Sequence, residues 1–426
     1  MLRLLTENIL DREEKTMAEW IECTIGDLCD TISDTYKGND ENVILINTSD
    51  VLEGKVLNHI PVPNKNLKGQ FKKTFRENDI LFSEIRPSNK RFAFVDFKHT
   101  SNYIASTKLM VLRHNDRVLP EYLFAILKST YVLEELQYLA ETRSGTFPQI
   151  TFTSELAPMK VNIPDKKTQN QIVSILSSIE QKININESIN NNLLEQIKTI
   201  CTAWLSEYKP FDGVMPSDWV ETPLSDIAEF ISGYSYKGTE LTDSTIAMAT
   251  IKSFDRKGGF KLDGYKEIIP SSKLKESQHA ELFDTLVAHT DLTQNAEVIG
   301  NAEPVMSKSG YNDIVFSMDL VKVLPKKDGV SKYLITAILQ DKKFKAHCLG
   351  YVNGTTVLHL SKKALPEYKL FLPSDFSTLK PLDEVVTALY KQVSSNISEN
   401  TYLEELRESL LPKLMSGELD VSDIEI

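Results

Sequence analysis

Two long stretches of the chain place apolar residues three and four positions apart, which is the spacing of an amphipathic helix. The first follows Pro164 and carries Ile172, Ile175, Leu176, Ile179 and Ile183, then Leu193, Leu194, Ile197, Ile200 and Trp204. The second carries Leu382, Val385, Val386, Leu389, Val393 and Ile397, then Leu403, Leu406, Leu410 and Leu414. These stripes predict two long helices with apolar seams. Such a seam is structural far more often than it is a cofactor site.

A continuous helix from Thr168 to Glu207 would be about 60 Å long at ~1.5 Å per residue. Because a whole domain lies between the two stretches, we expect the helices to meet as an antiparallel coiled coil that acts as a spacer. An asparagine-rich patch around Asn190 interrupts the first stripe, and the second contains Thr401. The pattern therefore leaves open whether each stretch is one helix or a helical hairpin.

The sequence before each stripe is typical of a mixed α/β domain. The apolar run Ile80–Phe82 predicts a buried strand, and Phe92–Phe97 alternates in part, as a half-buried strand does. Tyr122–Leu127 follows the helix-start signal Pro120 and predicts a buried helix, of which Tyr333–Leu339 is the counterpart.

Most of this pattern occurs twice. Trp20-Ile21-Glu22 opens a segment, and Trp219-Val220-Glu221 opens a similar one. Gly145-Thr146 and Pro164 recur as Gly354-Thr355 and Pro373 at one offset (354 − 145 = 209 and 373 − 164 = 209). Solenoid repeats are about 20–50 residues long, so a duplication of roughly 200 residues predicts two copies of a whole domain. Such a chain binds two similar targets, or one target with two similar halves.

Composition is ordinary for a globular protein with about two to four domains. The 426 residues are 41% apolar and 25% charged. The four cysteines lack Cys-x-x-Cys spacing, which predicts a reduced cytosolic chain without zinc or disulfides. No apolar run approaches the ~18 residues of a membrane span. The acids among the first sixteen residues are unlike a secretory signal, and Met17 is an alternative start.

Charge is distributed unevenly along the chain. The net charge of −12 argues against a protein coated with basic residues. Residues 58–113 nevertheless hold eleven basic and four acidic residues (11 − 4 = +7), and residues 252–275 hold seven and three (7 − 3 = +4). A solvated lysine-rich face explains either island alone. Their recurrence in both copies favours contacts with phosphate groups.

Two polar loops of the first copy carry groups suited to nucleic acid. Glu84–Arg91 is basic and stiffened by Pro87, and Arg143–Gln149 offers a guanidinium, hydroxyls and an amide. These groups hydrogen-bond phosphates and base edges. The loops therefore predict a nucleic-acid-binding surface.

Other functions fit less of the pattern. Asp50 with Glu53 and Lys55 is faintly similar to the carboxylate pair and lysine of a nuclease, but three such common residues often occur together by chance. The histidines lack metal-ligand spacing, and the loop hydroxyls lack a His/Asp arrangement to activate them. A protein–protein adaptor with duplicated binding domains explains the acidic charge and the coiled coil equally well. Salt-sensitive binding to duplex DNA distinguishes the two hypotheses.

The order and duplication of these features resemble the specificity subunit of type I restriction–modification systems. The resemblance covers about residues 17–420 and rests on the paired tryptophan openings, Asp79–Pro87, the Gly-Thr turns, Pro164 leading into Gln169, and the ending Leu410–Leu419. Two departures stand out. Thr168 replaces the family's acid before Gln169, and the second copy has His289-Thr290-Asp291 in place of the Ile-Arg-Pro loop.

The resemblance implies an α+β fold: two duplicated mixed α/β target-recognition domains separated by two long helices that form an antiparallel coiled coil. The expected recognition domains are residues 17–163 and 209–372, and the expected spacer helices are residues 164–208 and 373–420. Each domain is expected to read one half of a bipartite DNA sequence, with the half-sites roughly one turn (~34 Å) apart. Partner subunits are then expected to methylate adenine or to restrict the DNA.

The implied partners are double-stranded DNA, two methyltransferase subunits that bind S-adenosylmethionine, and restriction/translocase subunits. The chain itself is expected to be cytoplasmic, without catalytic residues, metal, cofactor or membrane contact. A bidentate contact of Arg86 or Arg91 with guanine, or of Gln149 with adenine, gives ~1–3 kcal/mol of discrimination. The candidate DNA-binding residues are Lys72, Lys73, Arg76, Arg86, Ser88, Asn89, Lys90, Arg91, Arg143, Thr146, Gln149, Lys237, Lys252, Arg256, Lys257, Thr290, Gln294, Asn295, Asn353 and Thr355.

Overall fold

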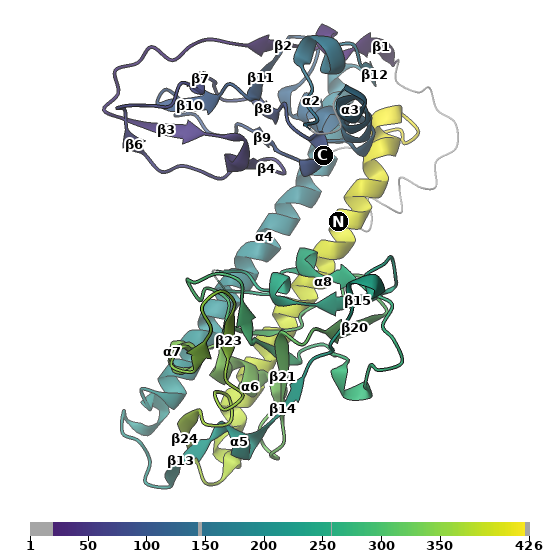
Figure 1. Ribbon diagram of the computed structural model, residues 1–426. Coiled ribbons are helices and arrows are strands. Elements are labelled where there is room, and N and C mark those ends of the chain that lie inside the picture. The colour runs from purple at the N-terminus through teal and green to yellow at the C-terminus, as the bar shows by residue number, and fades with distance from the viewer. Residues whose placement is uncertain (1–19, 144–146, 257, 422–426) are drawn as a thin grey trace. The chain divides into compact units, whose positions relative to one another are not determined.

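The computed structural model describes residues 20–143, 147–256 and 258–421. The alternative start Met17 and the site candidates Thr146 and Lys257 lie outside these residues. The chain forms two compact units: Met1–Gln181 with Glu404–Ile426, called unit 1, and Lys182–Leu403, called unit 2 (Figure 1).

Unit 1 contains two four-stranded sheets. The first has the order β2-β11-β8-β9 with antiparallel neighbours, and the second has the order β6-β3-β10-β7, in which β3 and β10 are parallel. The first sheet consists of β2 (Cys29–Ile32), β8 (Ile80–Ser83), β9 (Phe92–Phe94) and β11 (Leu109–His114). The second consists of β3 (Asn42–Ile46), β6 (Val62–Pro63), β7 (Phe71–Lys73) and β10 (Tyr103–Ser106). Two short pairs complete the unit, β1 (Ile21–Thr24) with β12 (Lys160–Ile163) and β4 (Val51–Leu52) with β5 (Lys55–Val56).

Strand β8 is an uninterrupted apolar run because it is buried on both faces. Ile80, Leu81 and Phe82 are each no more than 1% exposed. Asp79, which precedes the strand and is also buried, accepts two hydrogen bonds from the Arg113 guanidinium at 2.7 and 2.8 Å. This pairing compensates the buried carboxylate and fixes where β8 begins.

The helices of unit 1 follow β11. Helix α2 (Pro120–Leu127) begins at Pro120, as predicted, because the first turn of a helix does not use the missing proline N–H. Helix α3 (Thr130–Arg143) follows it directly. The predicted buried helix is therefore confirmed.

Unit 2 repeats the topology of unit 1. Its main sheet has the order β14-β21-β17-β19 with antiparallel neighbours, and its second sheet β16-β15-β20 contains one parallel pair. The strands are β14 (Ala228–Ser232), β15 (Ile246–Ala249), β16 (Lys266–Glu267), β17 (Thr285–Ala288), β19 (Ala302–Pro304), β20 (Asp313–Phe316) and β21 (Leu320–Pro325). A terminal pair, β13 (Trp219–Pro223) with β24 (Lys369–Pro373), corresponds to β1 with β12. Helices α5 (Leu224–Ile227), α6 (Lys332–Leu339) and α7 (Lys342–Leu349) complete the unit. The predicted α+β fold with a duplicated domain is confirmed.

The two long helices are each continuous. Helix α4 spans Lys166–Leu205 and helix α8 spans Lys380–Ser416, without a break at the asparagine patch or at Thr401. The Asp165 carboxylate accepts hydrogen bonds from the N–H groups of Lys167 and Thr168, which caps the start of α4. Over the described part of the chain, no helix has the length and apolar character needed to cross a membrane.

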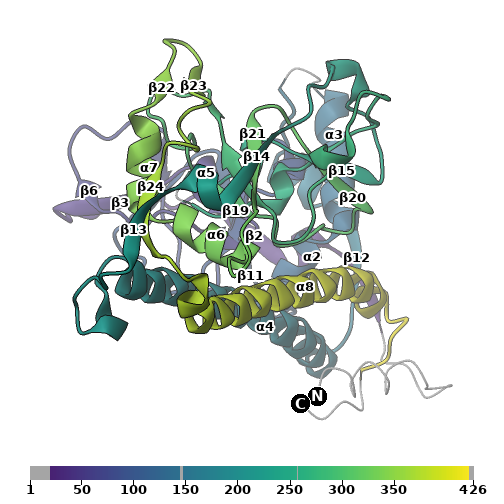
Figure 2. The ribbon, with the colours of Figure 1, turned by 90° about the horizontal axis from the view of Figure 1, so that it is seen from below.

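Helices α4 and α8 contact each other in both units. In unit 2, Asn186 donates to Asn400 and Asn396 donates to Asn190, both at 2.8 Å. A later residue of α4 thus contacts an earlier residue of α8, which shows that the two helices are antiparallel. In unit 1, Glu180 of α4 and Arg407 of α8 lie 3.8 Å apart. Figure 2 shows the two helices lying alongside each other. The predicted antiparallel pairing is confirmed.

The two units differ at one edge. Unit 2 has an extra sheet of order β18-β23-β22, made of β18 (Thr290–Asp291), β22 (Val352–Asn353) and β23 (Leu358–Leu360). At the equivalent place unit 1 has the isolated antiparallel bridge between Ile85 and Gln149. In both units the segment after the buried strand of the main sheet therefore meets the segment that follows the Gly-Thr pair in the sequence.

Candidate nucleic-acid interface

The Ile-Arg-Pro loop of unit 1 has an unusual backbone. Arg86 has φ +46° and Lys90 has φ +50°, on either side of the 3₁₀ turn η3 (Pro87–Asn89). Residues with a Cβ rarely adopt this left-handed conformation, which costs about 1–2 kcal/mol for each residue. Pro87 is buried beneath the loop, whereas Arg86, Ser88, Asn89 and Lys90 are exposed. The proline anchors the loop and the polar residues face solvent.

Three hydrogen bonds hold this backbone in place. Arg86 N–H donates to the Pro148 carbonyl at 3.2 Å, and Ile150 N–H donates to the Glu84 carbonyl at 2.9 Å. Ser88 N–H donates to the Gln137 side chain of α3 at 3.1 Å. The surrounding structure thus maintains a strained backbone, which is typical of functional loops.

Gln149 lies beside this loop, and a hydrogen bond from Lys108 fixes the orientation of its side-chain amide. Lys108 Nζ donates to Gln149 Oε1 at 3.0 Å and is 3.5 Å from the Glu84 carboxylate. The ammonium therefore occupies the acceptor end of the amide, and the NH₂ group is the end that Gln149 offers to a ligand.

The other cations near the loop make contacts within the protein. Arg91 donates from Nη1 to the backbone carbonyls of Ser49 and Val51 at 3.2 and 3.4 Å. Lys90 lies 3.4 Å from Glu53, and Arg143 lies 3.1 Å from Glu155. Among the described residues, no side-chain hydrogen bond or ion pair involves Arg86. The geometry thus separates Arg86 from Arg91, which the sequence left equivalent.

The cations of β7 and the turn after it form a separate group on the other sheet. Lys72 and Arg76 are exposed, as a phosphate contact requires. Lys73 instead donates from Nζ to the Leu109 carbonyl at 2.8 Å, and burial lowers the pKa of its ammonium. Alternation along the strand explains the difference, because neighbouring side chains point to opposite faces. Lys73 therefore supports the sheet in this conformation.

In unit 2, the loop after β18 is held together by two aspartates. Asp291 accepts hydrogen bonds from the N–H groups of Thr293 and Val298, at 2.8 and 2.7 Å. Thr290 is only 7% exposed and donates its hydroxyl to Asp319 at 3.0 Å. The candidate Thr290 therefore positions the loop from beneath. No sequence pattern indicated a role for either aspartate, because their partners are backbone N–H groups and a hydroxyl that only the fold brings together.

A second loop of unit 2 joins the first. Gln294 Nε2 donates to the carbonyls of Thr355 and Thr356, at 2.6 and 3.2 Å. Asn295, Asn353 and Thr355 are exposed on the two joined loops. These candidates lie together as Arg86 and Gln149 do in unit 1, and they present amides and hydroxyls instead of a guanidinium.

The basic island of unit 2 is divided between several sites. Arg256 lies in a hairpin closed by a bridge between Phe254 and Phe260, and its side chain is 68% exposed at 3.3 Å from Glu297. Lys252 is exposed within the short turn η7 (Ile251–Ser253). Lys237, which precedes the island in sequence, is exposed next to the short turn η6 (Gly238–Glu240). The structure thus groups Gln294 with Thr355 but does not join Lys237 or Lys252 to them by any described contact.

The described loops of both units present groups that suit recognition. Within the described ranges, no three or more His, Cys, Asp or Glu side chains gather in a way that holds a metal ion. Exposed cations, amides and hydroxyls on loops of two duplicated scaffolds are groups that contact DNA phosphates and bases. Fold and site thus define a two-domain nucleic-acid-recognition protein.

Comparison with known proteins agrees. Residues 17–195 match the family described as the type I restriction modification DNA specificity domain. The chain is 31% identical to the type I restriction enzyme HindI specificity subunit of Haemophilus influenzae, over 95% of this chain and 100% of that protein. It is 22% identical to the MjaIX specificity subunit of Methanocaldococcus jannaschii, over 72% and 71% of the two chains. The crystal structure of the type I S subunit from M. genitalium matches with a TM-score of 0.49 and 16% identity, over 95% of this chain and 98% of that one.

The chain therefore belongs to the family of type I restriction–modification specificity subunits. It is a DNA-recognition subunit and not an enzyme, because catalysis in these systems lies in partner subunits.

Proposed function

We propose that unit 1 and unit 2 each read one half of a bipartite duplex sequence, and that the paired helices set the interval between the halves. The recognition domains are residues 17–163 and 209–372, and residues 164–208 and 373–420 provide the spacer helices. The strained, exposed Arg86 loop is the observation that carries the proposal. A protein retains such strain where the conformation is needed for function.

The first half-site is read mainly by Arg86. A guanidinium that projects from a rigid loop can donate a bidentate pair to guanine O6 and N7, which gives ~1–3 kcal/mol of discrimination. Gln149 contributes its NH₂ donor beside it. Lys72, Arg76 and Lys90 contact phosphates, so they add affinity without sequence preference.

The second half-site is read by different chemistry. Asn295, Asn353 and Thr355 offer amides and a hydroxyl, which suit adenine and thymine edges better than the fork of an arginine does. The Gln294 NH₂ group holds the Thr355 and Thr356 carbonyls, so Gln294 joins the two loops and offers its amide oxygen. Arg256 supplies phosphate contact. The two half-sequences are therefore expected to differ, with guanine favoured in the first.

The chain works in the cytoplasm within a larger complex. Two methyltransferase subunits carry S-adenosylmethionine and methylate adenine in the recognised sequence, and restriction/translocase subunits join the same assembly. The family assignment supports this set of partners.

The proposal is tested by measuring duplex binding of the chain in complex with its methyltransferase subunit at several salt concentrations. Arg86→Ala, alone and with Arg91→Ala, should abolish the preference for one half-sequence while the complex stays assembled. Lys98→Ala is the matched control, because Lys98 is an exposed lysine of the same basic island outside the two loops. Unchanged sequence preference in both arginine variants would contradict the assignment. Binding without salt dependence would favour a protein–protein adaptor.

A further inference from the structure

The hairpin that carries Arg256 has a turn with little intrinsic rigidity. Gly258 has φ +97° and Gly259 has φ +109°, and Asp255 and Gly259 close the turn through a hydrogen bond of 2.9 Å. Glycine has wide conformational freedom, so two in succession need an external contact to hold one geometry. Phe254 and Phe260 pair at the base of the hairpin, away from the glycines.

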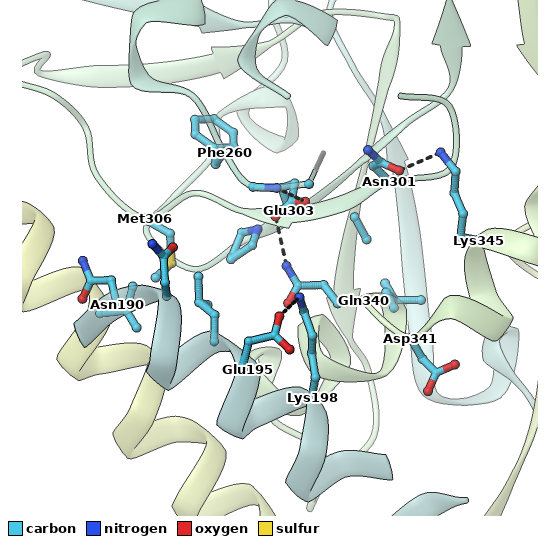
Figure 3. A pocket seen from close by; sticks show the side chains of 18 of the residues that line it. Asn190, Glu195, Lys198, Phe260, Asn301, Glu303, Met306, Gln340, Asp341 and Lys345 are labelled. Atoms are coloured by element: carbon cyan, nitrogen blue, oxygen red, sulfur yellow. Dashed lines mark hydrogen bonds and ion pairs between the residues drawn. The ribbon is translucent and has the colours of Figure 1, made fainter. Parts of the chain in front are cut away.

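Glu303 of β19 supplies that contact. Its carboxylate is buried, with the residue 6% exposed, and Oε1 accepts the Gly259 N–H at 2.7 Å. Figure 3 shows Glu303 between Phe260 of the hairpin and Gln340 at the end of α6. A charged acceptor makes hydrogen bonds roughly twice as strong as a neutral one does. The carboxylate is therefore a strong tether of the turn.

The tether continues into α8. Gln340 Nε2 donates to Glu303 Oε2 at 3.0 Å, and the buried Tyr390 hydroxyl donates to Gln340 Oε1 at 2.8 Å. Because Tyr390 occupies the amide oxygen, Gln340 must present its NH₂ group to Glu303. Both partners of the carboxylate are thus donors, and the geometry suits a carboxylate without a proton.

We propose that Glu303 is a positioning residue for DNA recognition by unit 2: its ionised carboxylate holds the Gly258-Gly259 turn so that Arg256 faces the phosphate backbone, and protonation releases the turn. This inference rests on the proposed DNA contact of Arg256. Glu303 itself is buried behind the hairpin and acts through it.

Protonation conflicts with the observed hydrogen bonds. A carboxyl O–H on either oxygen points at an N–H of Gly259 or Gln340, so one of the two bonds is lost. The hairpin has room to move, because a cavity of about 860 Å³ in unit 2 is lined by Gly258, Gly259 and Glu303. Release of the turn therefore requires no disruption of the core.

Burial of the Glu303 carboxyl places this change near neutral pH. Burial raises the pKa of the Glu303 carboxyl to about 7, while Lys198 of α4 opposes the rise and Asp255 of the hairpin adds to it. The other groups that face it are neutral, the Gln340 amide and the Tyr390 phenol, whose pKa burial raises. Between pH 6 and pH 8 the tether thus changes from mostly released to mostly formed.

Two variants separate the hydrogen-bond logic from a general structural role. Glu303→Gln imitates the protonated state, because its one amide oxygen cannot accept from both Gly259 and Gln340, and its NH₂ group meets an N–H donor at the other position. One of the two bonds that hold the turn is therefore lost. Adding Gln340→Glu exchanges the amide and the carboxylate and restores every donor–acceptor direction. Tyr390 then donates to the carboxylate now at position 340, the amide now at position 303 donates to that carboxylate, and Gly259 donates to the amide oxygen at position 303. The double variant should therefore rescue the turn, which a packing defect would not allow.

The experiment measures affinity of the methyltransferase complex for a duplex that carries its methylated motif, between pH 6 and pH 8. We expect the wild type to bind about tenfold more tightly at pH 8 than at pH 6, from the loss of one charge-assisted contact. Glu303→Gln should bind about tenfold more weakly at pH 8 without that pH dependence, and the double variant should recover most of the affinity at pH 8. A Glu303→Gln variant with wild-type affinity and pH profile would overturn the proposal.

Two further measurements test the Glu303 tether and the proposed DNA contact of Arg256 separately. If Arg256→Ala leaves DNA binding unchanged, the hairpin does not contact DNA and the proposed phosphate contact of Arg256 is wrong. Hydrogen exchange of the Gly258 and Gly259 amides, corrected for intrinsic rates, tests the tether without DNA. Protection at pH 8 that falls at pH 6 in the wild type supports the tether, and equal protection in the wild type and Glu303→Gln refutes it.

Discussion

Replacing Arg86 by glycine should stabilise the protein and impair its function. Arg86 has φ +46°, a conformation that costs a residue with a Cβ about 1–2 kcal/mol and costs glycine nothing. Glycine also gains freedom in the unfolded chain, which costs about 0.4–1 kcal/mol. The difference predicts a gain of about 0.5–1 kcal/mol in the free energy of unfolding of unit 1.

The same substitution removes the guanidinium that we assign to guanine. The loss of a bidentate contact corresponds to ~1–3 kcal/mol, or about a tenfold to hundredfold loss of discrimination at one base pair. Stability and recognition are thus expected to change in opposite directions. A residue with only a structural role would change both in the same direction.

Calorimetry of the chain measures the gain in stability, since a unit of this size gains about 2–4 °C in melting temperature per kcal/mol of unfolding free energy. Competition between duplexes that differ at one base pair of the first half-sequence measures the loss of discrimination. Lys90→Gly is the matched control, because φ is +50° at Lys90 and its side chain is assigned to phosphate. The control should gain similar stability and weaken binding equally for all sequences. A destabilised Arg86→Gly variant would show that the backbone at Arg86 is not strained, and intact discrimination would show that Arg86 does not read a base.

Three further predictions concern the scaffold. The Glu303 pKa is raised from 4.5 to about 7, so between these pH values folded Glu303 keeps a proton that the unfolded chain loses. The free energy of unfolding should therefore fall by up to about 3 kcal/mol as the pH rises from 4.5 to about 7. Chemical denaturation at several pH values should show this fall in the wild type and not in Glu303→Gln. Gly417→Val should destabilise unit 1 by more than about 1 kcal/mol, because φ is +78° and an added Cβ would lie 2.5 Å from Trp20 Nε1; an unchanged melting temperature would contradict this. Asn396→Leu should cost about 1–3 kcal/mol by leaving buried Asn190 without its partner, while Asn396→Leu with Asn190→Leu should recover most of it; a double variant no better than the single one would be inconsistent with this cause.

The sequence was sufficient to predict the repeated architecture. Apolar spacing located both long helices, and Pro120 located the start of α2, because these signals depend on residues close together in the chain. The duplication then required matching topologies, which the parallel pairs β3–β10 and β15–β20 confirm. The continuity of the helices through Asn190 was not predictable, because the partner that satisfies this asparagine is remote in sequence.

The candidate site was predictable in part. The sequence identified the loops, but it ranked Arg86 with Arg91, whose guanidinium holds the Ser49 and Val51 carbonyls. It also treated Lys73 as a phosphate contact, although its ammonium binds the Leu109 carbonyl in this conformation. A basic residue type indicates a charge but not its partner, and the partners here come from distant strands.

Methylome sequencing shows whether this chain directs methylation to a bipartite DNA sequence. A methylation-free host would express the cognate methyltransferase subunit with this chain, without it, or with its Arg86→Ala variant. We expect a bipartite adenine-methylation motif that requires the chain, and a relaxed first half-sequence in the variant. The same motif with and without the chain, or no motif despite copurification of the two proteins, would contradict it.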